Sequence, residues 1–438
     1  MLLDLMYALA LLSLAPLIAI RAFRHGRYRR GWKQKLLGLG TTEAKRLTQG
    51  KPCLWLHAVS VGEVNLIRQL VAELERRNPN HTVVISATTD TGYDLARKHF
   101  GKDRVFFCPF DFSWAVRRTC KHLKPELLVL AELELWPNLI HAADRCGCAA
   151  TVINGRLSDN SASRYQGFGW LTRPLFQALR HVECQDHSAA KNFKSCGTPA
   201  ERIGVSGSMK FDNAPNGREN HQVQSRLAWA GVDPWHLVWM VGSTQEGEEA
   251  MALRVYQRLR HQHPELRLIL VPRHQERFDS VATEIESAGL IAHRRSQNGS
   301  RQNDSWAAER VILIDTIGEL RHWWGVSQLA TVGGSFGDRG GQNMLEPAGY
   351  GCAVSFGPNT RNFRQIAEEL LNSEAAVRVN DEQELEKFVE TCAKDLPRAD
   401  ALGRQARRVV ERHRGATQRT LAVIDAVMRG AETSRAAA

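Results

Sequence analysis

The sequence has few of the features that would hold a metal ion or a disulfide framework. Its nine cysteines are scattered over 438 residues without a C-x-x-C pair, and Cys146 and Cys148 are the closest two. An odd number of cysteines without metal-ligand spacing indicates reduced thiols that face the cytosol. The chain also lacks a D-x-D motif and a cluster of histidine and cysteine ligands, so we expect no obligatory metal ion.

Acidic side chains are outnumbered by basic ones. The 47 Asp and Glu residues against 58 Lys and Arg give a formal charge of +11 and a pI near 9.4. This excess favours an anionic partner, such as nucleic acid, anionic lipid or a phosphorylated small molecule. With 43% hydrophobic and 24% charged residues, the composition is that of an ordinary globular protein, and the length predicts two domains.

Long hydrophobic runs are absent from most of the chain, and the exception is the N-terminus. From Leu2 to Ile20 only Asp4 is charged, and about 19 residues approach the ~20 that cross a bilayer. Seven basic residues follow between Arg21 and Lys35, which places the rest of the chain in the cytoplasm. We expect residues 1–35 to form a membrane anchor with a basic flank, with a buried or interfacial helix as the alternative. Anionic lipid head groups then account for much of the positive charge without nucleic acid.

From Lys51 onward, short apolar runs alternate with segments of helical period. The apolar runs are residues 53–59, 82–89, 105–110, 126–134, 149–154, 181–185, 237–241, 266–271, 311–314 and 329–332. This alternation predicts βαβ units and parallel sheets that are covered by helices on both faces. A long helical run over 398–428 closes the pattern.

A polar stretch with a proline and a glycine at 212–224 divides the apolar runs into two sets. The sequence therefore predicts an α/β fold with two Rossmann-like domains and a ligand in the cleft between them. The expected limits are 36–212 for the N-terminal domain, 213–226 for a linker, 227–428 for the C-terminal domain and 429–438 for a tail.

The stretch from Val332 to Gly351 predicts the end of a buried strand, a glycine loop and the first turns of a helix. Five glycines between 333 and 341 would let the backbone approach a ligand closely, and Asn343 is a suitable N-cap. The free N–H groups and the dipole of such a helix favour a phosphate. Glu346, about one turn inside the helix, would repel a phosphate and instead hold a neutral diol such as a ribose. A plain strand–turn–helix connection is the alternative.

The N-terminal half offers three carboxylates and a lysine near strand ends. The segment 60–63 (SVGE) follows a strand and opens a helix, so Glu63 is either part of a capping box or a base at the edge of the cleft. Its place in the first helical turn, with no other acid beside it in the sequence, favours the ionised form. Glu132 and Glu134 lie two apart and share a face if their strand persists, while a bend would separate them. Lys210 is a cation at the expected rim of the cleft, or a plain surface lysine.

Seven motifs occur in order along the chain. They are 57–63 (HAVSVGE), 134–138 (ELWPN), 154–158 (NGRLS), 207–212 (GSMKFD), 271–274 (VPRH), 318–320 (GEL) and 343–347 (NMLEP). Together these motifs, spread over nearly the whole chain, resemble those of the transferases of 3-deoxy-D-manno-octulosonic acid (Kdo) in lipopolysaccharide assembly. Those enzymes are membrane-anchored glycosyltransferases with two Rossmann-like domains, the GT-B type.

The resemblance implies transfer of Kdo from CMP-Kdo to a lipid A precursor, lipid IVA. It places Glu63 on the family's general base, and Glu132 and Lys210 on its transition-state stabilisers. The family's CMP-binding segments fall on Pro272, Arg273, Ile317, Gly318, Glu319, Asn343, Met344, Leu345 and Glu346. Because an activated donor needs no protein nucleophile, we expect inversion at the anomeric carbon and no cofactor besides the donor.

The resemblance further implies an inner-membrane protein with a single N-terminal anchor and cytoplasmic catalytic domains. Its partners would be CMP-Kdo, the lipid A precursor and anionic membrane lipids, and no nucleic acid. Two positions depart from the family, in which histidine is frequent at the place of Gln245 and a basic residue at the place of Asn160. The alternatives are another two-domain sugar-nucleotide enzyme, such as a UDP-sugar epimerase or a different glycosyltransferase, and a non-catalytic membrane-associated protein that binds lipid or nucleic acid.

Overall fold

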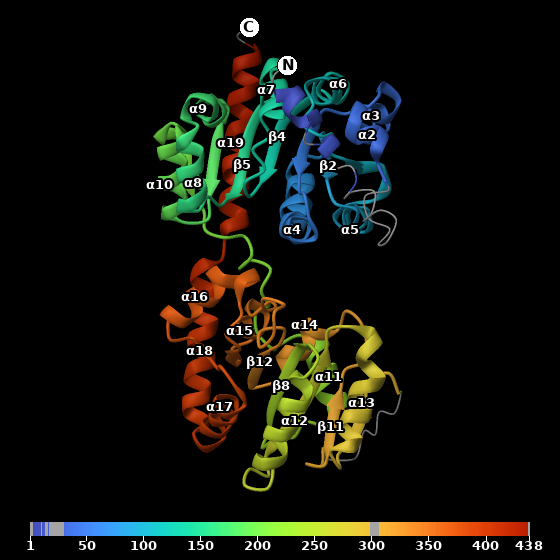
Figure 1. Ribbon diagram of the computed structural model, residues 1–438, viewed down its shortest axis with the longest axis vertical. Coiled ribbons are helices and arrows are strands. Elements are labelled where there is room, and N and C mark those ends of the chain that lie inside the picture. The colour runs from blue at the N-terminus through green and yellow to red at the C-terminus, as the bar shows by residue number, and fades with distance from the viewer. Residues whose placement is uncertain (1–2, 10, 14–15, 17–29, 298–305, 437–438) are drawn as a thin grey trace. The chain divides into compact units, whose positions relative to one another are not determined.

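The computed structural model of the protein describes residues 3–9, 11–13, 16, 30–297 and 306–436, and Figure 1 shows their secondary structure. The chain divides into two compact units. Unit 1 comprises Met1–Asn213 together with Arg414–Ala438, and unit 2 comprises Ala214–His413. Each unit has its own parallel sheet and its own hydrophobic core.

Unit 1 is built on a sheet whose described strands follow the order β3-β2-β1-β4-β5-β6-β7, with neighbouring strands parallel. The strands are β1 (Cys53–His57), β2 (Thr82–Ala87), β3 (Val105–Phe107), β4 (Pro125–Ala131), β5 (Ala149–Gly155), β6 (His181–Cys184) and β7 (Ile203–Val205). The first six follow the Rossmann order. Every residue of β1 is buried, because helices cover both faces of a parallel sheet and favour continuous apolar runs such as CLWLH.

The helices of unit 1 lie on the two faces of this sheet. They are α2 (Trp32–Leu37), α3 (Thr41–Thr48), α4 (Val61–Arg77), α5 (Asp90–Phe100), α6 (Ser113–Leu123), α7 (Pro137–Arg145), α8 (Asp159–Gly167), α9 (Gly169–Ala178), α10 (His187–Cys196) and α19 (Ala416–Ala436). Trp55 and Leu128 face a core layer shared with α3, α6, α7, α9 and α10. Leu54 and Val129 face the other layer, shared with α4, α5 and α19. Successive residues of each strand therefore enter opposite layers, as the two-residue period of a strand requires.

Unit 2 repeats this arrangement around a second parallel sheet, whose described strands follow the order β10-β11-β9-β8-β12-β13-β14. The strands are β8 (Leu237–Thr244), β9 (Leu266–Pro272), β10 (Ile291–Arg294), β11 (Arg310–Leu313), β12 (Leu329–Val332), β13 (Ala353–Phe356) and β14 (Ala376–Arg378). The helices are α11 (His221–Ala230), α12 (Glu248–Leu259), α13 (Phe278–Ser287), α14 (Leu320–Trp323), α15 (Leu345–Gly349), α16 (Arg364–Asn372), α17 (Glu382–Lys394) and α18 (Leu396–His413). Two α/β units with parallel sheets are therefore present, as the sequence predicts.

The C-terminal boundary differs from expectation. The helical run predicted over 398–428 consists of two helices, α18 and α19, because the helix is interrupted at Gly415. Gly415 has φ +87°, a left-handed conformation that favours glycine. The carboxylate of Asp212 accepts hydrogen bonds from the N–H groups of Gly415 (2.6 Å) and Thr417 (2.5 Å), which fixes the start of α19. Helix α19 packs on the sheet of unit 1 (Figure 1). The predicted extent of the C-terminal domain and the separate tail are therefore wrong.

The polar segment 213–226, expected as a linker, belongs to unit 2 from its second residue onward. Its last part forms the start of α11, where the Asn220 side chain accepts the N–H of Val223 at 3.0 Å and caps the helix. Arg218 donates to the backbone carbonyl of Ser327 at 2.6 Å. The polar composition of this segment therefore reflects a helix cap and an arginine contact, and the expectation of a free linker is wrong.

The predicted anchor falls partly on residues 1–2, 10, 14–15 and 17–29, which lie outside the described residues. Residues 3–9 and 11–13 are helical. None of the described helices is long and apolar enough to cross a membrane. Two polar side chains tie the described N-terminal residues to unit 1. The Asp4 carboxylate accepts the N–H of Ser113 at 2.7 Å, and the Tyr7 hydroxyl donates to Asp111 at 3.1 Å.

Candidate active site

Strand β4 ends in a strained backbone where two candidate carboxylates were expected to lie. It ends at Ala131, and Glu132 follows with φ +59°, a left-handed conformation that costs a residue other than glycine roughly 1 kcal/mol or more. The N–H of Glu132 donates to the carbonyl of Ile153 at 3.0 Å. The strand does not continue through 134, so Glu132 and Glu134 do not share a strand face. The bend turns the Glu132 side chain toward Lys210.

Lys210 is placed by the loop that follows β7. The N–H of Met209 donates to the Asn154 side chain at 3.0 Å, and the Met209 side chain is fully buried. Asp212 fixes the other end of the loop through its bonds to α19. Between these two points, the Lys210 ammonium lies 2.8 Å from the Glu132 carboxylate. The structure thus brings together the predicted pair from distant parts of the sequence.

Glu63 lies in the first turn of α4, and both interpretations of its motif have a basis in the structure. Its carboxylate accepts the N–H of Val59 at 2.6 Å and the hydroxyl of Ser60 at 3.1 Å, so it does hold the helix start. Burial raises the pKa of Glu63 to about 7, and repulsion from Glu134 and Glu132 adds to the effect of burial. The expectation that Glu63 favours the ionised form is therefore wrong, because the side chain is buried and the fold brings the acids of the turn after β4 close to it.

Glu134 completes this group of carboxylates. Burial raises its pKa, while the indole N–H of Trp136, which donates to its carboxylate at 2.9 Å, acts in the opposite direction. The pKa of Glu63, near 7, is well matched to taking a proton at neutral pH. The Lys210 ammonium beside Glu132 can stabilise negative charge in the same region. The edge of the unit 1 sheet can therefore combine a base with a cation.

The glycine loop after β12 in unit 2 already holds a carboxylate, that of Glu248. It accepts the N–H groups of Gly334 (2.8 Å), Ser335 (3.2 Å) and Phe336 (3.2 Å), and also that of Gln245 (2.8 Å). Glu248 is itself buried. Because these N–H groups already bond to Glu248, they are not open to a phosphate. The prediction of a phosphate-binding loop is therefore wrong for residues 334–336. No motif in the sequence indicates these bonds, because Gly247 is the N-cap residue of α12 and Gln245 is not the serine or threonine that a capping box requires.

The helix expected to have Asn343 as its N-cap residue begins one residue later than predicted, at Leu345. Helix α15 has Met344 as its N-cap residue, and the Asn343 side chain accepts the N–H of Leu345 at 3.1 Å. Glu346 is the second residue of this short helix and is not one turn inside it. Met344 and Leu345 are 0% and 2% exposed, so their side chains belong to the core. Only their backbone could contact a ligand.

Two arginines, Arg321 and Arg273, lie near enough to Glu346 for their charges to act on its carboxylate. Its carboxylate accepts the Asn343 side-chain amide at 3.4 Å. Burial raises the pKa of Glu346, and the positive charges of Arg321 and Arg273 oppose that rise. Arg273 follows Pro272, the last residue of β9, and its N–H donates to the carbonyl of Thr244. The predicted residues at 272–273 and 343–346 are therefore brought to one region of unit 2.

In the predicted segment 317–319, Ile317 and Gly318 are exposed and Glu319 is half-buried. Ile317 is 76% exposed, and Gly318 has φ +87°. The Glu319 carboxylate accepts Arg295 at 3.0 Å and the Trp323 indole N–H at 3.1 Å. Its side chain is thus engaged within unit 2, and the backbone of the segment is the part that could contact a ligand.

Two buried polar atoms adjoin this segment. The hydroxyl of Thr316 and the Nδ1 atom of His322 are buried and have no hydrogen-bond partner in the described part of the chain. Buried polar groups are nearly always paired in folded proteins, and an exception at a binding site is explained by a ligand or water. No three His, Cys, Asp or Glu side chains converge as metal ligands among the described residues.

Comparison with known proteins gives the family. The family model described as 3-Deoxy-D-manno-octulosonic-acid transferase (kdotransferase) matches residues 30–213. The 3-deoxy-D-manno-octulosonic acid transferase of Bordetella pertussis is 34% identical over 436 residues, which are 96% of this chain and 98% of that relative. The enzyme of the same description from Haemophilus influenzae is 32% identical over 372 residues, covering 84% and 85%.

Solved structures show the same fold at low identity. A glycosyltransferase from Rickettsia africae has a TM-score of 0.55 and 11% identity, covering 86% of this chain and 99% of that chain. The two α/β units are therefore those of a GT-B-like fold. The resemblance drawn from the seven motifs is confirmed by the family match and by the two relatives. The chain belongs to the Kdo transferase family, and it is a glycosyltransferase of lipopolysaccharide biosynthesis.

Proposed function

We propose that the protein transfers Kdo from CMP-Kdo to the lipid A precursor lipid IVA, with inversion at the anomeric carbon. The observation that carries the reaction is Glu63, a carboxylate with a pKa near 7 beside the Lys210–Glu132 pair. Glu63 takes the proton of the acceptor hydroxyl, whose oxygen bonds to the anomeric carbon. The bond from that carbon to the phosphate oxygen breaks, and CMP leaves with the electron pair.

Lys210 and Glu132 act on the charge that develops during transfer. The ammonium of Lys210, 2.8 Å from Glu132, stabilises negative charge on the donor, and Glu132 holds the ammonium in place. A fixed charge of this kind needs no reorganisation when the bond breaks. Mass spectrometry of the lipid made from purified precursor and a source of CMP-Kdo tests the reaction. A lipid without added Kdo would contradict the proposal.

The nucleotide is assigned to unit 2. Arg273 and Arg321 supply positive charge for the phosphate, and Glu346 accepts the ribose hydroxyls. The backbone of Ile317 and Gly318 contacts the remainder of the nucleotide. The unpartnered Thr316 hydroxyl and His322 ring nitrogen beside that segment support this assignment, since a nucleotide would give them partners. Transfer therefore requires residues of both units.

Nucleotide binding is tested by thermal protection and calorimetry. CMP should protect the protein and UDP should not. Glu346→Gln should weaken CMP binding by roughly 1.5 to 3 kcal/mol, the usual range for hydrogen bonds to a charged group. Glu286→Gln, which removes an exposed carboxylate of α13, is the matched control and should bind CMP normally. Wild-type affinity in Glu346→Gln would remove Glu346 from the site.

The chemistry as proposed uses no metal ion, because Lys210 and the arginines of unit 2 supply the positive charge. Activity should be unchanged after exhaustive treatment with EDTA. Loss of activity that returns with a divalent cation would contradict this part of the proposal.

We place the protein at the inner membrane through residues 1–35, with both units in the cytoplasm. The described part of that segment has polar side chains that bond to unit 1 and apolar side chains that are exposed. Asp4 and Tyr7 bond to unit 1, whereas Leu9 is 58% and Leu12 is 70% exposed. Exposed leucines on a helical segment followed by basic residues are typical of membrane contact.

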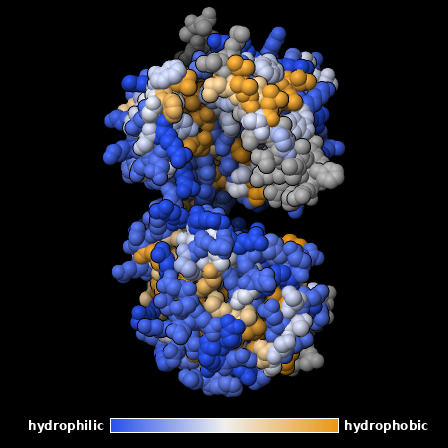
Figure 2. Space-filling view, viewed as in Figure 1, coloured by the Kyte–Doolittle hydropathy of each residue, from blue (hydrophilic) through white to orange (hydrophobic). Residues whose placement is uncertain are grey.

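Unit 1 carries further exposed apolar side chains at the junction of α8 and α9. Phe168, Trp170 and Leu171 are 63%, 79% and 51% exposed. Figure 2 shows broad apolar areas on the face of unit 1 that is visible there. Large exposed apolar areas mark interaction sites, and a lipid acceptor in a bilayer gives unit 1 a reason to carry them.

Membrane contact is tested by sedimentation with vesicles that contain anionic phospholipid. Leu9→Lys together with Leu12→Lys should reduce vesicle binding and leave transfer to acceptor in detergent intact. These substitutions keep the Asp4 and Tyr7 bonds, which deletion of the segment would remove. Leu396→Lys, at an exposed leucine of unit 2, is the control. Equal vesicle binding by all three proteins would contradict the anchor.

A further inference from the structure

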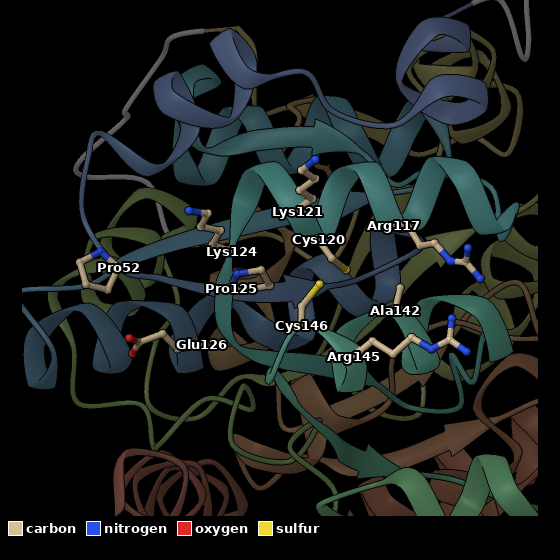
Figure 3. A pocket seen from close by; sticks show the side chains of 10 residues that line it. All are labelled: Pro52, Arg117, Cys120, Lys121, Lys124, Pro125, Glu126, Ala142, Arg145 and Cys146. Carbon is tan, nitrogen blue, oxygen red and sulfur yellow. The ribbon is translucent and has the colours of Figure 1, made fainter. Parts of the chain in front are cut away.

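Unit 1 contains a pocket of about 760 Å³ at the ends of α6 and α7 and the start of β4. Figure 3 shows the pocket with its lining side chains. Pro125, the first residue of β4, lines the pocket, whereas Glu132 follows the last residue of the same strand. A strand of this length spans roughly 20 Å at about 3.3 Å per residue. The pocket is therefore separate from the carboxylates that act in transfer.

Four cationic side chains line this pocket. They are Arg117, Lys121, Lys124 and Arg145. In the part of the chain that the structure describes, the side chains of all four are exposed and none of them forms a hydrogen bond or an ion pair. The acidic side chain at the pocket, Glu126, accepts a hydrogen bond from His81 at 2.9 Å. The lining of the pocket thus carries four positive charges and one negative charge, and the negative one already has a partner.

The floor of the pocket is less polar than its rim. Cys120 and Ala142 are buried and line it together with Pro125. A volume near 760 Å³ lies within the range of sites that take small molecules. The cations at the rim would contact an anionic part of a ligand, and the less polar floor would contact a less polar part.

Helix dipoles account for some of these cations. Lys121 and Arg145 lie in the last turns of α6 and α7, and Lys124 is the C-cap residue of α6. Cations are favoured at such positions without any ligand. Arg117 lies more than a turn before the end of α6, where the dipole gives no such benefit. The dipoles therefore do not explain why Arg117 adds a fourth cation to the same pocket.

We propose that this pocket binds a small molecule that carries phosphate groups with two or more negative charges. Two guanidinium groups offer paired N–H donors that match phosphate oxygens, and the two lysines add mobile positive charge. The same chemistry is offered by a soluble phosphate compound and by a phospholipid head group. The site is distinct from the nucleotide site of unit 2 and does not depend on it.

Binding is measured with inorganic pyrophosphate, in the presence of CMP so that the proposed nucleotide site is filled. The variant with Arg117→Ala and Lys121→Ala removes two charges from the pocket. The control with Arg118→Ala and Lys98→Ala removes two exposed charges from the same unit, outside the pocket. We expect saturable binding of one pyrophosphate that weakens by about tenfold in the pocket variant and is kept in the control. Equal weakening in both variants, or no saturable binding, would overturn the proposal.

Cys146 provides a reporter within the pocket. All nine cysteines are free, and Cys146 is exposed while the other eight are buried. Its alkylation by the neutral reagent iodoacetamide should slow when a ligand fills the pocket. Protection by pyrophosphate assigns a soluble phosphate compound, and protection only by vesicles that contain phosphatidic acid, whose head group is a phosphate monoester, assigns a lipid head group. In either case the pocket variant should lose the protection, and protection by neither would sink the proposal.

Discussion

Glu63 in unit 1 and Glu248 in unit 2 occupy comparable places and differ in how they are held. Each follows the first strand of its sheet and lies in the first turn of a helix. Glu248 accepts four backbone N–H groups from two loops, whereas Glu63 accepts one N–H and one hydroxyl and has Glu132 and Glu134 nearby. Burial raises the pKa of both. The difference teaches that the same position in a repeated fold can hold a structural carboxylate or a reactive one, and that the surrounding donors decide which.

The comparison is tested most strongly by removing the structural carboxylate. Glu248→Ala should destabilise unit 2 by roughly 3 kcal/mol or more, because several buried N–H groups lose their acceptor at once. Hydrogen exchange at residues 334–336 should accelerate, and urea unfolding should occur at lower concentration. Glu246→Ala, at an exposed neighbour, is the control and should change neither measurement. Unchanged exchange in Glu248→Ala would show that the loop holds its own shape.

Glu63→Gln tests the reactive carboxylate. Glutamine can still accept the Val59 N–H, but it cannot take a proton, so transfer should fall by roughly 10² to 10⁴-fold. Folding and CMP affinity should stay near wild type, which circular dichroism and calorimetry would check. Glu73→Gln, on the same helix and paired with Arg76, serves as the control. A Glu63→Gln enzyme with a near wild-type rate would leave Glu63 as a helix cap, and Glu132 would become the next candidate for the base.

Lys210→Met tests whether transfer depends on the positive charge of Lys210 as well as on the base. The substitution keeps much of the side-chain volume and removes the charge 2.8 Å from Glu132. Transfer should fall by roughly 10²-fold, the scale for losing one fixed stabilising group, while the Kd for CMP changes little because the nucleotide is assigned to unit 2. Steady-state rates with the lipid acceptor and calorimetry with CMP separate the two effects. A loss confined to CMP affinity would contradict the role given to Lys210.

Much of the fold could be predicted because buried parallel strands are continuous apolar runs. The run CLWLH is β1, and LVWMV begins β8. Strands β7, β10 and β14 were missed because they lie at the edges of their sheets and are not continuously buried, so their sequences lack a long apolar run. The break at Gly415 was also missed, because helical periodicity continues on both sides of it. Its left-handed conformation is fixed by Asp212, some 200 residues away in sequence.

The candidate site could be predicted as a set of residues but not as a set of interactions. The family resemblance named Glu63, Glu132 and Lys210, yet the contact between Lys210 and Glu132 depends on the left-handed turn after β4. The raised pKa of Glu63 depends on burial and on the acids of the turn that follows β4. Neither property is local in sequence. The bonds of Glu248 to the glycine loop likewise need the start of α12 to lie beside the loop that follows β12.

The smallest expected effect concerns Glu134, whose negative charge helps to raise the pKa of Glu63. Glu63 must be deprotonated to act as a base, so kcat/KM should rise with pH up to about 7 and level off above it. Glu134→Gln removes one repulsive charge and keeps an acceptor for the Trp136 indole. The pKa of Glu63 should then fall, and the rising limb should move to lower pH by less than about one unit. Measured at pH 6, the variant should therefore retain a larger fraction of its plateau rate than the wild type.

Glu201→Gln, which removes an exposed charge from the same unit, should leave the rising limb of the pH profile in place. A limb that stays fixed in Glu134→Gln would show that burial alone sets the pKa of Glu63, and that the difference from Glu248 lies only in the number of donors.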